Sequence, residues 1–305
     1  MLHAFNEMNR DLLVNINGEL QHREEAGVSP FDSAVQAGDA VWESLRLYQG
    51  SIFKLTEHLG RLRSGASSLA FTDIPTPEDI IHEIRQTLDA NNMWDSVYIR
   101  LTLTRGIKLT SGTDPRLNAH GSTLIVLAEH KPPASANTGL RLITATHRCP
   151  DPDSIDSSIR HINSIHDVLA KVQANAAGVD DAVMLDSRGF VTRTNTAHLF
   201  IVTDGKVLTP RTHACHGGIT RSAILGICEQ NGIPHAECDL SLAQVCQSDE
   251  VFCADTMNEL SAVNEVDGTT IGHGEVGPVT LRLSNLFRSI TTTSGTVVVD
   301  RKSTA

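Results

Sequence analysis

A cysteine stands between two histidines in the run His213-Ala214-Cys215-His216, which closes a loop before a predicted helix. The thiolate is the nucleophilic form of cysteine, and neighbouring imidazolium groups lower the pKa of a thiol. The run therefore predicts that Cys215 is a nucleophile. The alternative interpretation is a loop that carries ordinary polar residues.

Two other histidines, His161 and His166, are candidates for proton transfer, and Asp167 follows the second. Histidine suits this role because its unperturbed pKa lies close to neutrality. Five residues separate the two along what we expect to be one helix, so they would not share one face well. The 14 histidines of the chain are scattered and form no HExxH spacing. We therefore predict no metal site.

Two further patterns suit anionic groups. The run Gly218-Ile219-Thr220-Arg221 opens a predicted helix over residues 222–231. Free backbone N–H groups at a helix N-terminus, with the hydroxyl of Thr220 beside them, form a natural phosphate site. Arg100 lies on an alternating strand, 98–105, where its guanidinium can make a two-pronged contact with a carboxylate. A solvent-facing strand arginine is the alternative for Arg100.

The elements that position these residues follow from the spacing of apolar positions. Ile162, Ile165, Leu169 and Val172 recur at helical spacing, so a helix is predicted over residues 164–177, with Gly178 as its cap. The rest of the chain is predicted to contain strands and hairpins over 12–20, 41–48, 98–105, 123–128, 139–146, 182–192, 199–208, 251–254 and 266–271, and helices from 54, over 78–90, over 222–231 and from 279.

Several of these segments together resemble one family. The motifs are GVDDAVMLDSRGFV, NTAHLFIVTDGKVLTP and GGITR, preceded by the N-terminal run from Gly38-Asp39 to His58-Leu59-Gly60-Arg61-Leu62. They are similar to the class IV aminotransferases, which include branched-chain and D-amino-acid aminotransferases and aminodeoxychorismate lyase. The resemblance covers residues 31–287. It implies an α/β (α+β) fold, namely the two-domain fold type IV scaffold of pyridoxal-phosphate enzymes, and a homodimer.

The resemblance also implies roles for individual residues. Those that match the family's phosphate-binding positions are Arg61, Ile219, Thr220 and Thr256, and those placed at the substrate are Tyr98, Arg100, Arg193 and Asn163. Asp255 departs from the small or hydroxyl residue that is usual beside Thr256. A carboxylate there opposes a phosphate dianion unless it caps the turn or is paired.

Two departures concern the reaction itself. Aligned on Asn163 and Gly178, the family's Schiff-base lysine falls at Arg160, and the glutamate at the pyridine nitrogen falls at Arg193. Arginine cannot replace the lysine, because its guanidinium stays protonated to about pH 12 and is a poor nucleophile. We therefore expect no cofactor, or pyridoxal 5'-phosphate if the family chemistry is retained.

Three functions are compatible with this family resemblance and its two departures. The first is a pyridoxal-phosphate-independent lyase, hydrolase or isomerase that binds a small anionic substrate through Arg61, Arg100, Arg160 and Arg193. Its catalytic candidates are Arg160, His161, His166 and Cys215. The second is a pyridoxal-phosphate aminotransferase of amino acids or amines. The third is a non-catalytic metabolite-binding protein, which would use the arginines but not the loop that contains Cys215.

The composition limits which binding partners and which cellular location we expect. Of the residues, 40% are apolar and 20% are charged, as in ordinary globular proteins. The net charge of −11 argues against nucleic-acid and anionic-membrane partners. No membrane span or signal peptide is apparent, so we expect a cytoplasmic protein with reduced cysteines. We predict an N-terminal domain over 1–130, a linker over 131–138, a larger domain over 139–290 and a flexible tail over 291–305.

Overall fold

The computed structural model describes residues 5–133 and 139–300, which fold as two compact units. The N-terminal unit contains the described residues 5–132, 159–163 and 291–300, and the C-terminal unit contains residues 133, 139–158 and 164–290. The linker predicted over residues 131–138 falls largely on residues 134–138, which lie outside the described residues.

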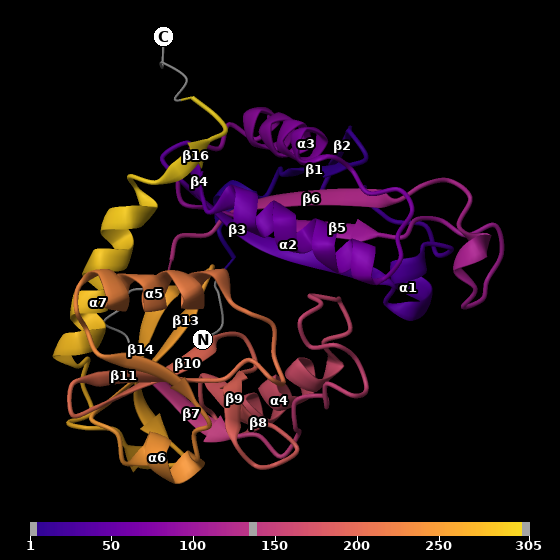
Figure 1. The fold of residues 1–305 in the computed structure, drawn as a ribbon. Coiled ribbons are helices and arrows are strands. Elements are labelled where there is room, and N and C mark those ends of the chain that lie inside the picture. The colour runs from indigo at the N-terminus through magenta and orange to yellow at the C-terminus, as the bar shows by residue number, and fades with distance from the viewer. Residues whose placement is uncertain (1–4, 134–138, 301–305) are drawn as a thin grey trace. The chain divides into compact units, whose positions relative to one another are not determined.

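A seven-stranded sheet forms the N-terminal unit, with the strand order β16-β4-β3-β5-β6-β1-β2 (Figure 1). Its elements are η1 (Glu7–Asn9), β1 (Leu13–Ile16), β2 (Glu19–His22), α1 (Ser33–Ala37), β3 (Ala40–Tyr48), β4 (Ser51–Phe53), α2 (Leu55–Ser68), α3 (Pro77–Ala90), β5 (Val97–Thr104), η2 (Pro115–Leu117), β6 (Thr123–His130) and β16 (Gly295–Val297).

The two faces of this sheet differ because side chains alternate along a strand. Val41, Leu45 and Leu47 of β3 lie in one hydrophobic core with apolar residues of α2 and α3, so these two helices cover one face. The positions between them, which include Trp42 and Ser44, belong to the opposite face. We call this opposite face the polar face of the sheet.

A segment that is distant in sequence extends the N-terminal sheet. The backbone N–H of Trp42 donates to the carbonyl of Arg160 (3.0 Å), and that of Ile162 donates to the carbonyl of Ala40 (3.1 Å). An isolated antiparallel bridge joins Val41 to His161. Residues 159–163 therefore lie as a short strand beside β3. The prediction of a helix that includes both His161 and His166 is wrong, because the helix begins at Ile165.

The end of the chain was expected to be a flexible tail, but its described part is ordered. Strand β16 pairs with β4, and the side chains of Val298 and Val299 are buried in the core of the N-terminal unit. The expectation was wrong for these residues because the apolar run at 297–299 completes a sheet edge and a core that sequence alone does not reveal.

A nine-stranded sheet forms the C-terminal unit, with the order β12-β11-β10-β13-β14-β7-β8-β9 and β15 paired to β14. Its elements are β7 (Leu140–Thr144), α4 (Ile165–Ala176), β8 (Asp181–Leu185), β9 (Val191–Thr194), β10 (His198–Thr203), β11 (Lys206–Pro210), α5 (Ile219–Gln230), β12 (His235–Cys238), α6 (Leu242–Cys246), β13 (Glu250–Asp255), β14 (Glu259–Val266), β15 (Thr269–Thr270) and α7 (Pro278–Thr291).

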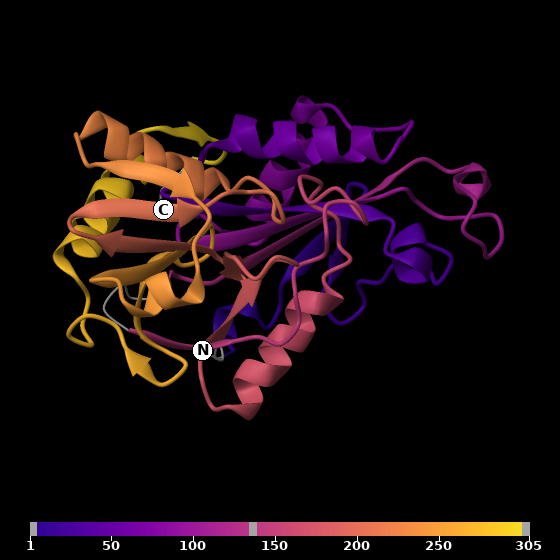
Figure 2. The same cartoon turned by 60° about the horizontal axis from the view of Figure 1, so that its bottom comes forward.

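Helix α4 packs on β8 through small residues (Figure 2, rose helix). Ala170 and Ala174 are its buried side chains. Its large apolar residues are exposed on one side, namely Ile165, Val168, Leu169 and Val172, which we call the α4 stripe. The helical spacing predicted the helix correctly, but it did not identify the buried face.

Among the described residues, no helix is both long enough and apolar enough to cross a membrane.

Candidate functional site

Two arginines share one tryptophan on the polar face of the N-terminal sheet. The Cζ atoms of Arg100 and Arg160 lie 4.0 Å and 3.9 Å from the centre of the Trp42 ring. Trp42 and Arg160 are neighbours because residues 159–163 pair with β3, and Arg100 is brought close by β5, the next strand. Cations over an indole face gain electrostatic energy, which holds both guanidiniums in place.

A third arginine is held beneath them by a buried carboxylate. Arg61 of α2 donates to Glu43 through Nε (2.6 Å) and through a terminal nitrogen (2.8 Å). The second oxygen of Glu43 also contacts Nδ1 of His58 at 2.8 Å. The side chain of Glu43 is 0% exposed and that of His58 is 2% exposed. This is a two-pronged, charge-assisted contact in a region that excludes water.

The charges at this site are strongly coupled. Burial alone would raise the pKa of Glu43, but the field of Arg160 and the hydrogen bonds from His58 and Arg61 outweigh it and lower the pKa to about 2. Burial lowers the pKa of His58, although Glu43 opposes this. Glu43 therefore stays ionised and compensates part of the positive charge.

Arg160 forms no ion pair among the described residues, although Glu43 lies close enough to act on its charge. Burial lowers its pKa to about 10, with Arg61 and Arg100 acting in the same direction and Glu43 and Tyr98 opposing them. Among the described residues, its buried Nε has no hydrogen-bond partner. A guanidinium with this pKa remains charged near neutrality, so the position expected for a lysine holds a fixed cation.

Tyr98 and Asn163 lie close to these arginines. The hydroxyl of Tyr98 is hydrogen-bonded to Oγ of Ser44 (2.9 Å). Asn163 donates through its side-chain amide to the carbonyl of Gly38 (2.9 Å), and its backbone N–H donates to Nδ1 of His161 (3.1 Å). The N-terminal unit thus brings together six of the predicted site residues, namely Arg61, Tyr98, Arg100, Arg160, His161 and Asn163.

Arg193 belongs to the C-terminal unit, where it forms an ion pair. Its guanidinium lies 2.7 Å from a carboxylate oxygen of Asp167, and His166 contacts the same group, with Nε2 at 3.3 Å. Burial alone would lower the pKa of Arg193, but Asp167 and the thiols of Cys149 and Cys215 reverse this and raise it. Arg193 was predicted to bind substrate. In the structure its charge is compensated by Asp167.

The environment of Cys215 contradicts its prediction as a low-pKa nucleophile. The residue is 5% exposed, and burial raises the pKa of its thiol to about 11, against a smaller opposing effect of Arg193. The two histidines beside it in sequence are not among the groups that determine this pKa. A thiol that stays protonated and buried is a poor nucleophile, so these surroundings weigh against the predicted role of Cys215.

The turns predicted to bind phosphate also belong to the C-terminal unit. Gly218 is the N-cap of α5, so Ile219 and Thr220 occupy the first turn of that helix. In the turn after β13, Oδ1 of Asp255 accepts from the backbone N–H groups of Met257 (2.6 Å) and Asn258 (2.7 Å). Asp255 therefore caps the turn that contains Thr256, which answers the objection that its carboxylate raised.

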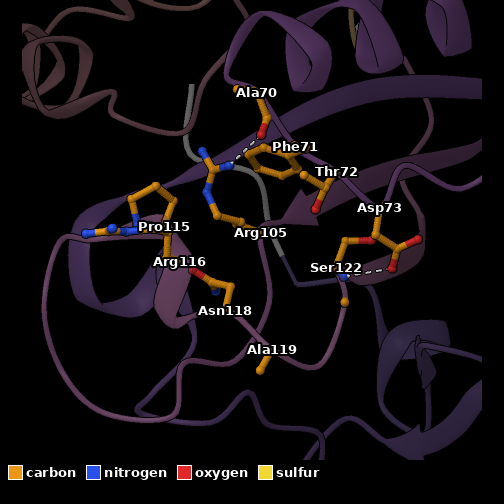
Figure 3. Close-up of a pocket in the computed structure, with 11 residues that line it drawn as sticks. Ala70, Phe71, Thr72, Asp73, Arg105, Pro115, Arg116, Asn118, Ala119 and Ser122 are labelled. Atoms are coloured by element: carbon orange, nitrogen blue, oxygen red, sulfur yellow. Dashed lines mark hydrogen bonds between the residues drawn. The ribbon is translucent and has the colours of Figure 1, made fainter.

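A separate pocket of about 690 Å³ opens elsewhere on the N-terminal unit (Figure 3). It lies between the residues that follow α2, such as Phe71 and Asp73, and the segment 115–122. Arg105 in its wall is already paired with Asp39 and stacked on Phe71. None of the predicted site residues lines this pocket. Among the described residues, no group of histidine, cysteine or acidic side chains is placed to hold a metal ion.

Sequence reasoning missed Trp42, Glu43 and His58 as members of the site. A signal was present for Glu43, which is a charged residue at a core-facing position of an otherwise apolar strand. Such a residue requires a buried partner. His58 and Arg61 are one helical turn apart on α2 and therefore face the same way.

Comparison with known proteins identifies the family of this chain. The family described as "Amino-transferase class IV" matches residues 40–266. Branched-chain-amino-acid aminotransferase-like protein 2 of Arabidopsis thaliana is 48% identical over 288 residues, which are 94% of this chain and 52% of that protein. A putative branched-chain-amino-acid aminotransferase of Methanocaldococcus jannaschii is 37% identical, over 94% of this chain and 99% of that protein.

The chain thus spans about half the length of the Arabidopsis relatives that it matches. Among solved structures, a branched-chain amino acid aminotransferase from T.th. in complex with N-(5'-phosphopyridoxyl)-L-glutamate has a TM-score of 0.85 at 29% identity. The similarity covers 92% of this chain and 94% of that one. The chain belongs to the class IV aminotransferase family and has its fold type IV architecture.

Proposed function

We propose that this class IV aminotransferase-fold chain is an enzyme that binds a small anionic substrate through Arg61, Arg100 and Arg160 and acts without a Schiff-base lysine. The observation that carries the proposal is the pair of guanidiniums stacked on Trp42, at 3.9 and 4.0 Å, above one buried carboxylate. Two guanidiniums that form no ion pair among the described residues, beside the Arg61–Glu43 pair, favour a ligand that brings negative charge.

The state of Arg160 supports an anionic ligand in particular. Its pKa is lowered to about 10 because burial and like charges disfavour the cation. An anion in contact with Arg160 relieves that cost and gives the buried Nε an acceptor. Planar guanidinium groups match carboxylate and phosphate oxygens in pairs, so these are the groups we expect on the substrate.

The residues of this chain suit the phosphate group of pyridoxal phosphate but not its reactive aldehyde. The N-terminus of α5, with Thr220, and the capped turn at Thr256 suit a phosphate. In our alignment with the family, Arg160 stands at the lysine position and Arg193 at the glutamate position. A charged arginine and an arginine paired with Asp167 do not suit the reactive end. We therefore assign no reaction step to this cofactor.

Three other lysines are engaged in contacts of their own and do not replace the missing one. Lys54 is paired with Glu57 (2.7 Å), Lys108 donates to the carbonyl of Gly112 (2.5 Å), and Lys171 donates to the carbonyl of Asp180. Lys131 differs, since its Nζ lies 5.5 Å from the centre of the Tyr98 ring.

We propose His161 as a proton-transfer group, although its pairing with Val41 directs its side chain to the face of the sheet opposite to that of Arg160. It follows Arg160 directly, and its Nδ1 accepts a hydrogen bond from the backbone N–H of Asn163. This bond favours the neutral tautomer with the proton on Nε2, whose N–H can donate a hydrogen bond to the substrate. Only the imidazolium form, which carries a second proton, can transfer a proton to the substrate. Proton transfer next to an anchored carboxylate suits a lyase, a hydrolase or an isomerase. His166 remains a second candidate.

The experiment is a screen of small carboxylates and phosphates at constant ionic strength, followed by nuclear magnetic resonance assays for turnover. We expect Arg160→Met to weaken binding of the best ligand by about ten- to a hundredfold, as for the loss of a charge-assisted contact. Arg10→Met, on an exposed arginine of the same unit, is the matched control. Equal affinity of Arg160→Met and wild type would contradict the proposal. Binding without any turnover would instead identify a metabolite-binding protein.

A pyridoxal-phosphate aminotransferase is the second candidate function. The phosphate-compatible turns favour it, as does the similarity to structures that contain pyridoxamine 5'-phosphate or phosphopyridoxyl-glutamate. It predicts that an added amino acid and 2-keto acid exchange their amino group in a cofactor-dependent way. Absence of such exchange with branched-chain and D-amino acids would exclude it for those substrates.

We also propose that the chain forms a homodimer, as the family resemblance implies. The α4 stripe supports this, because four large apolar side chains on one helix face are exposed, with Ile165 at 67% and Val172 at 56%. Burial of such a stripe against a second copy would remove it from water. A cytoplasmic location likewise stays a prediction.

A further inference from the structure

The row of cations on the polar face of the N-terminal sheet is not limited to Arg100 and Arg160. In the register of β3 and β5, Ser44 pairs with Arg100, and Arg46 pairs with Tyr98. Directly opposed residues of antiparallel strands project on the same face. Arg46 and Tyr98 therefore share the polar face with Trp42 and Arg100.

Lys131 stands at the far end of this row and is fixed there by its backbone. Its N–H donates to the carbonyl of Ser96 (3.1 Å), and its own carbonyl accepts from a terminal nitrogen of Arg46 (2.8 Å). Its ammonium lies over the ring of Tyr98, 5.5 Å from the centre. The hydroxyl of Tyr98 is in turn bonded to Ser44, so the ring lies between Lys131 and the arginine end.

The two ends of the row are held by different positions along the strands. Trp42, which carries Arg100 and Arg160, and Arg46, which is bonded to Lys131, are four residues apart on β3. At the rise of a β-strand this is about 13 Å. The face also contains one carboxylate in register with Tyr98, that of Glu129. Within the described residues, Arg100 and Arg160 supply cations at one end of the row and Lys131 supplies a cation at the other.

We propose that the anion site extends along this face and that its substrate is an elongated dianion. One carboxylate or phosphate binds between Arg100 and Arg160, and a second anionic group binds at Lys131. The body of the ligand lies along Tyr98. Lys131 is thus a specificity-determining residue that distinguishes long dianions from short anions. This inference rests on the proposed function, since it assumes that the arginine end binds an anion.

The geometry favours this occupant because the two ends differ in chemistry. At one end, planar guanidiniums can make paired contacts with a carboxylate or phosphate. At the other end, Lys131 offers a point charge on a flexible stem, which tolerates variation in ligand length. The site should therefore select a ligand by the distance between its two anionic groups more than by the chemical identity of the group at Lys131.

The test is a binding series with unbranched dicarboxylates from malonate to sebacate, at fixed ionic strength, with Trp42 fluorescence and calorimetry as readouts. A second arm uses ω-phosphorylated fatty acids of matched length to separate carboxylate from phosphate recognition at the distal end. The variants are Lys131→Met, Lys131→Arg, Arg160→Met and, as the control, Lys206→Met on an exposed lysine of the C-terminal unit. Thermal unfolding checks that each variant is folded.

We expect Lys131→Met to lower the affinity for the long dianions about tenfold while leaving malonate binding unchanged, and Lys131→Arg to restore the preference. Lys206→Met should behave as wild type. If Lys131→Met binds every length as wild type does, the extended site is wrong even though the arginine site stands. If Arg160→Met also binds every ligand as wild type does, or if the wild type binds none of them, the proposed function itself fails.

Discussion

Substitution of Glu43 by glutamine should destabilise the N-terminal unit strongly. Glu43 is fully buried, and its two oxygens contact Arg61 at 2.6 and 2.8 Å and His58 at 2.8 Å. Its pKa falls from 4.5 to about 2, and a shift of this size corresponds to about 3 kcal/mol of stability. Removal of one partner of a buried ion pair costs about 3–5 kcal/mol in other proteins. The two estimates agree in magnitude.

The sign of the pH dependence follows from the direction of the shift. Because the folded-state pKa of Glu43 lies below its unfolded value, its contribution is fully present above about pH 5. It is lost as the pH falls from there towards the folded pKa of about 2. Glu43→Gln should therefore be less stable than wild type at neutral pH and should lose less further stability on acidification.

The assay is urea unfolding followed by tryptophan fluorescence between neutral pH and pH 3. Both tryptophans of the chain, Trp42 and Trp94, lie in the N-terminal unit, so the signal reports on that unit. The matched control is Glu57→Gln. It removes an exposed carboxylate of α2 that is paired with Lys54. This control should cost less than about 1 kcal/mol. An unfolding free energy of Glu43→Gln within about 1 kcal/mol of wild type would refute the reasoning.

Three further outcomes are expected. Because burial raises the pKa of Cys215 to about 11, iodoacetamide should label it in denatured but not in native protein, and rapid native labelling at pH 8 would contradict this burial. If α4 mediates dimerisation, Leu169→Glu should shift the mass measured by light scattering to that of a monomer while Asn175→Glu does not, and two unchanged masses would exclude the stripe. Val298→Asp should destabilise the N-terminal unit by about 2–4 kcal/mol in the same fluorescence assay, and an unchanged unfolding midpoint would show that the buried segment after β16 contributes little.

Local patterns in the sequence predicted most of the elements. The alternating residues of β3 and β5 and the spacing of α4 gave strands and a helix close to those observed. The family motifs identified the fold correctly, since they depend on an ordered series along most of the chain. These features succeed because each is determined by neighbouring residues.

Features that depend on distant partners were not predictable in this way. Residues 159–163 pair with β3 across more than a hundred positions, and this pairing brings Arg160 over Trp42. The two histidines near Cys215 suggested a reactive thiol, but burial by the fold determines its pKa. The exposed face of α4 is another case, because alanines rather than large residues meet β8.

Arg160 and Arg193, which we align with the family's lysine and glutamate, differ in their surroundings. Arg193 has a carboxylate within ion-pair distance, so its charge is compensated inside the C-terminal unit. Arg160 shares the single carboxylate of Glu43 with Arg61 and has a buried nitrogen without a partner among the described residues. The Nε of Arg193 is likewise buried without a partner among the described residues, so the ion pair with Asp167 is what distinguishes the two arginines. Our proposal centres on Arg160 because it has no such ion pair in the described part of the chain.

The central claim is that Arg160 serves an anion site and that no lysine forms a Schiff base with pyridoxal phosphate. The most direct measurement incubates the protein with pyridoxal phosphate, reduces it with borohydride and maps the adduct by mass spectrometry, with Arg160→Lys as the positive comparison. We predict no stoichiometric adduct on any lysine of the wild type and an adduct at position 160 in the variant. A stoichiometric adduct in the wild type, at Lys131 or at any other lysine, would contradict the account.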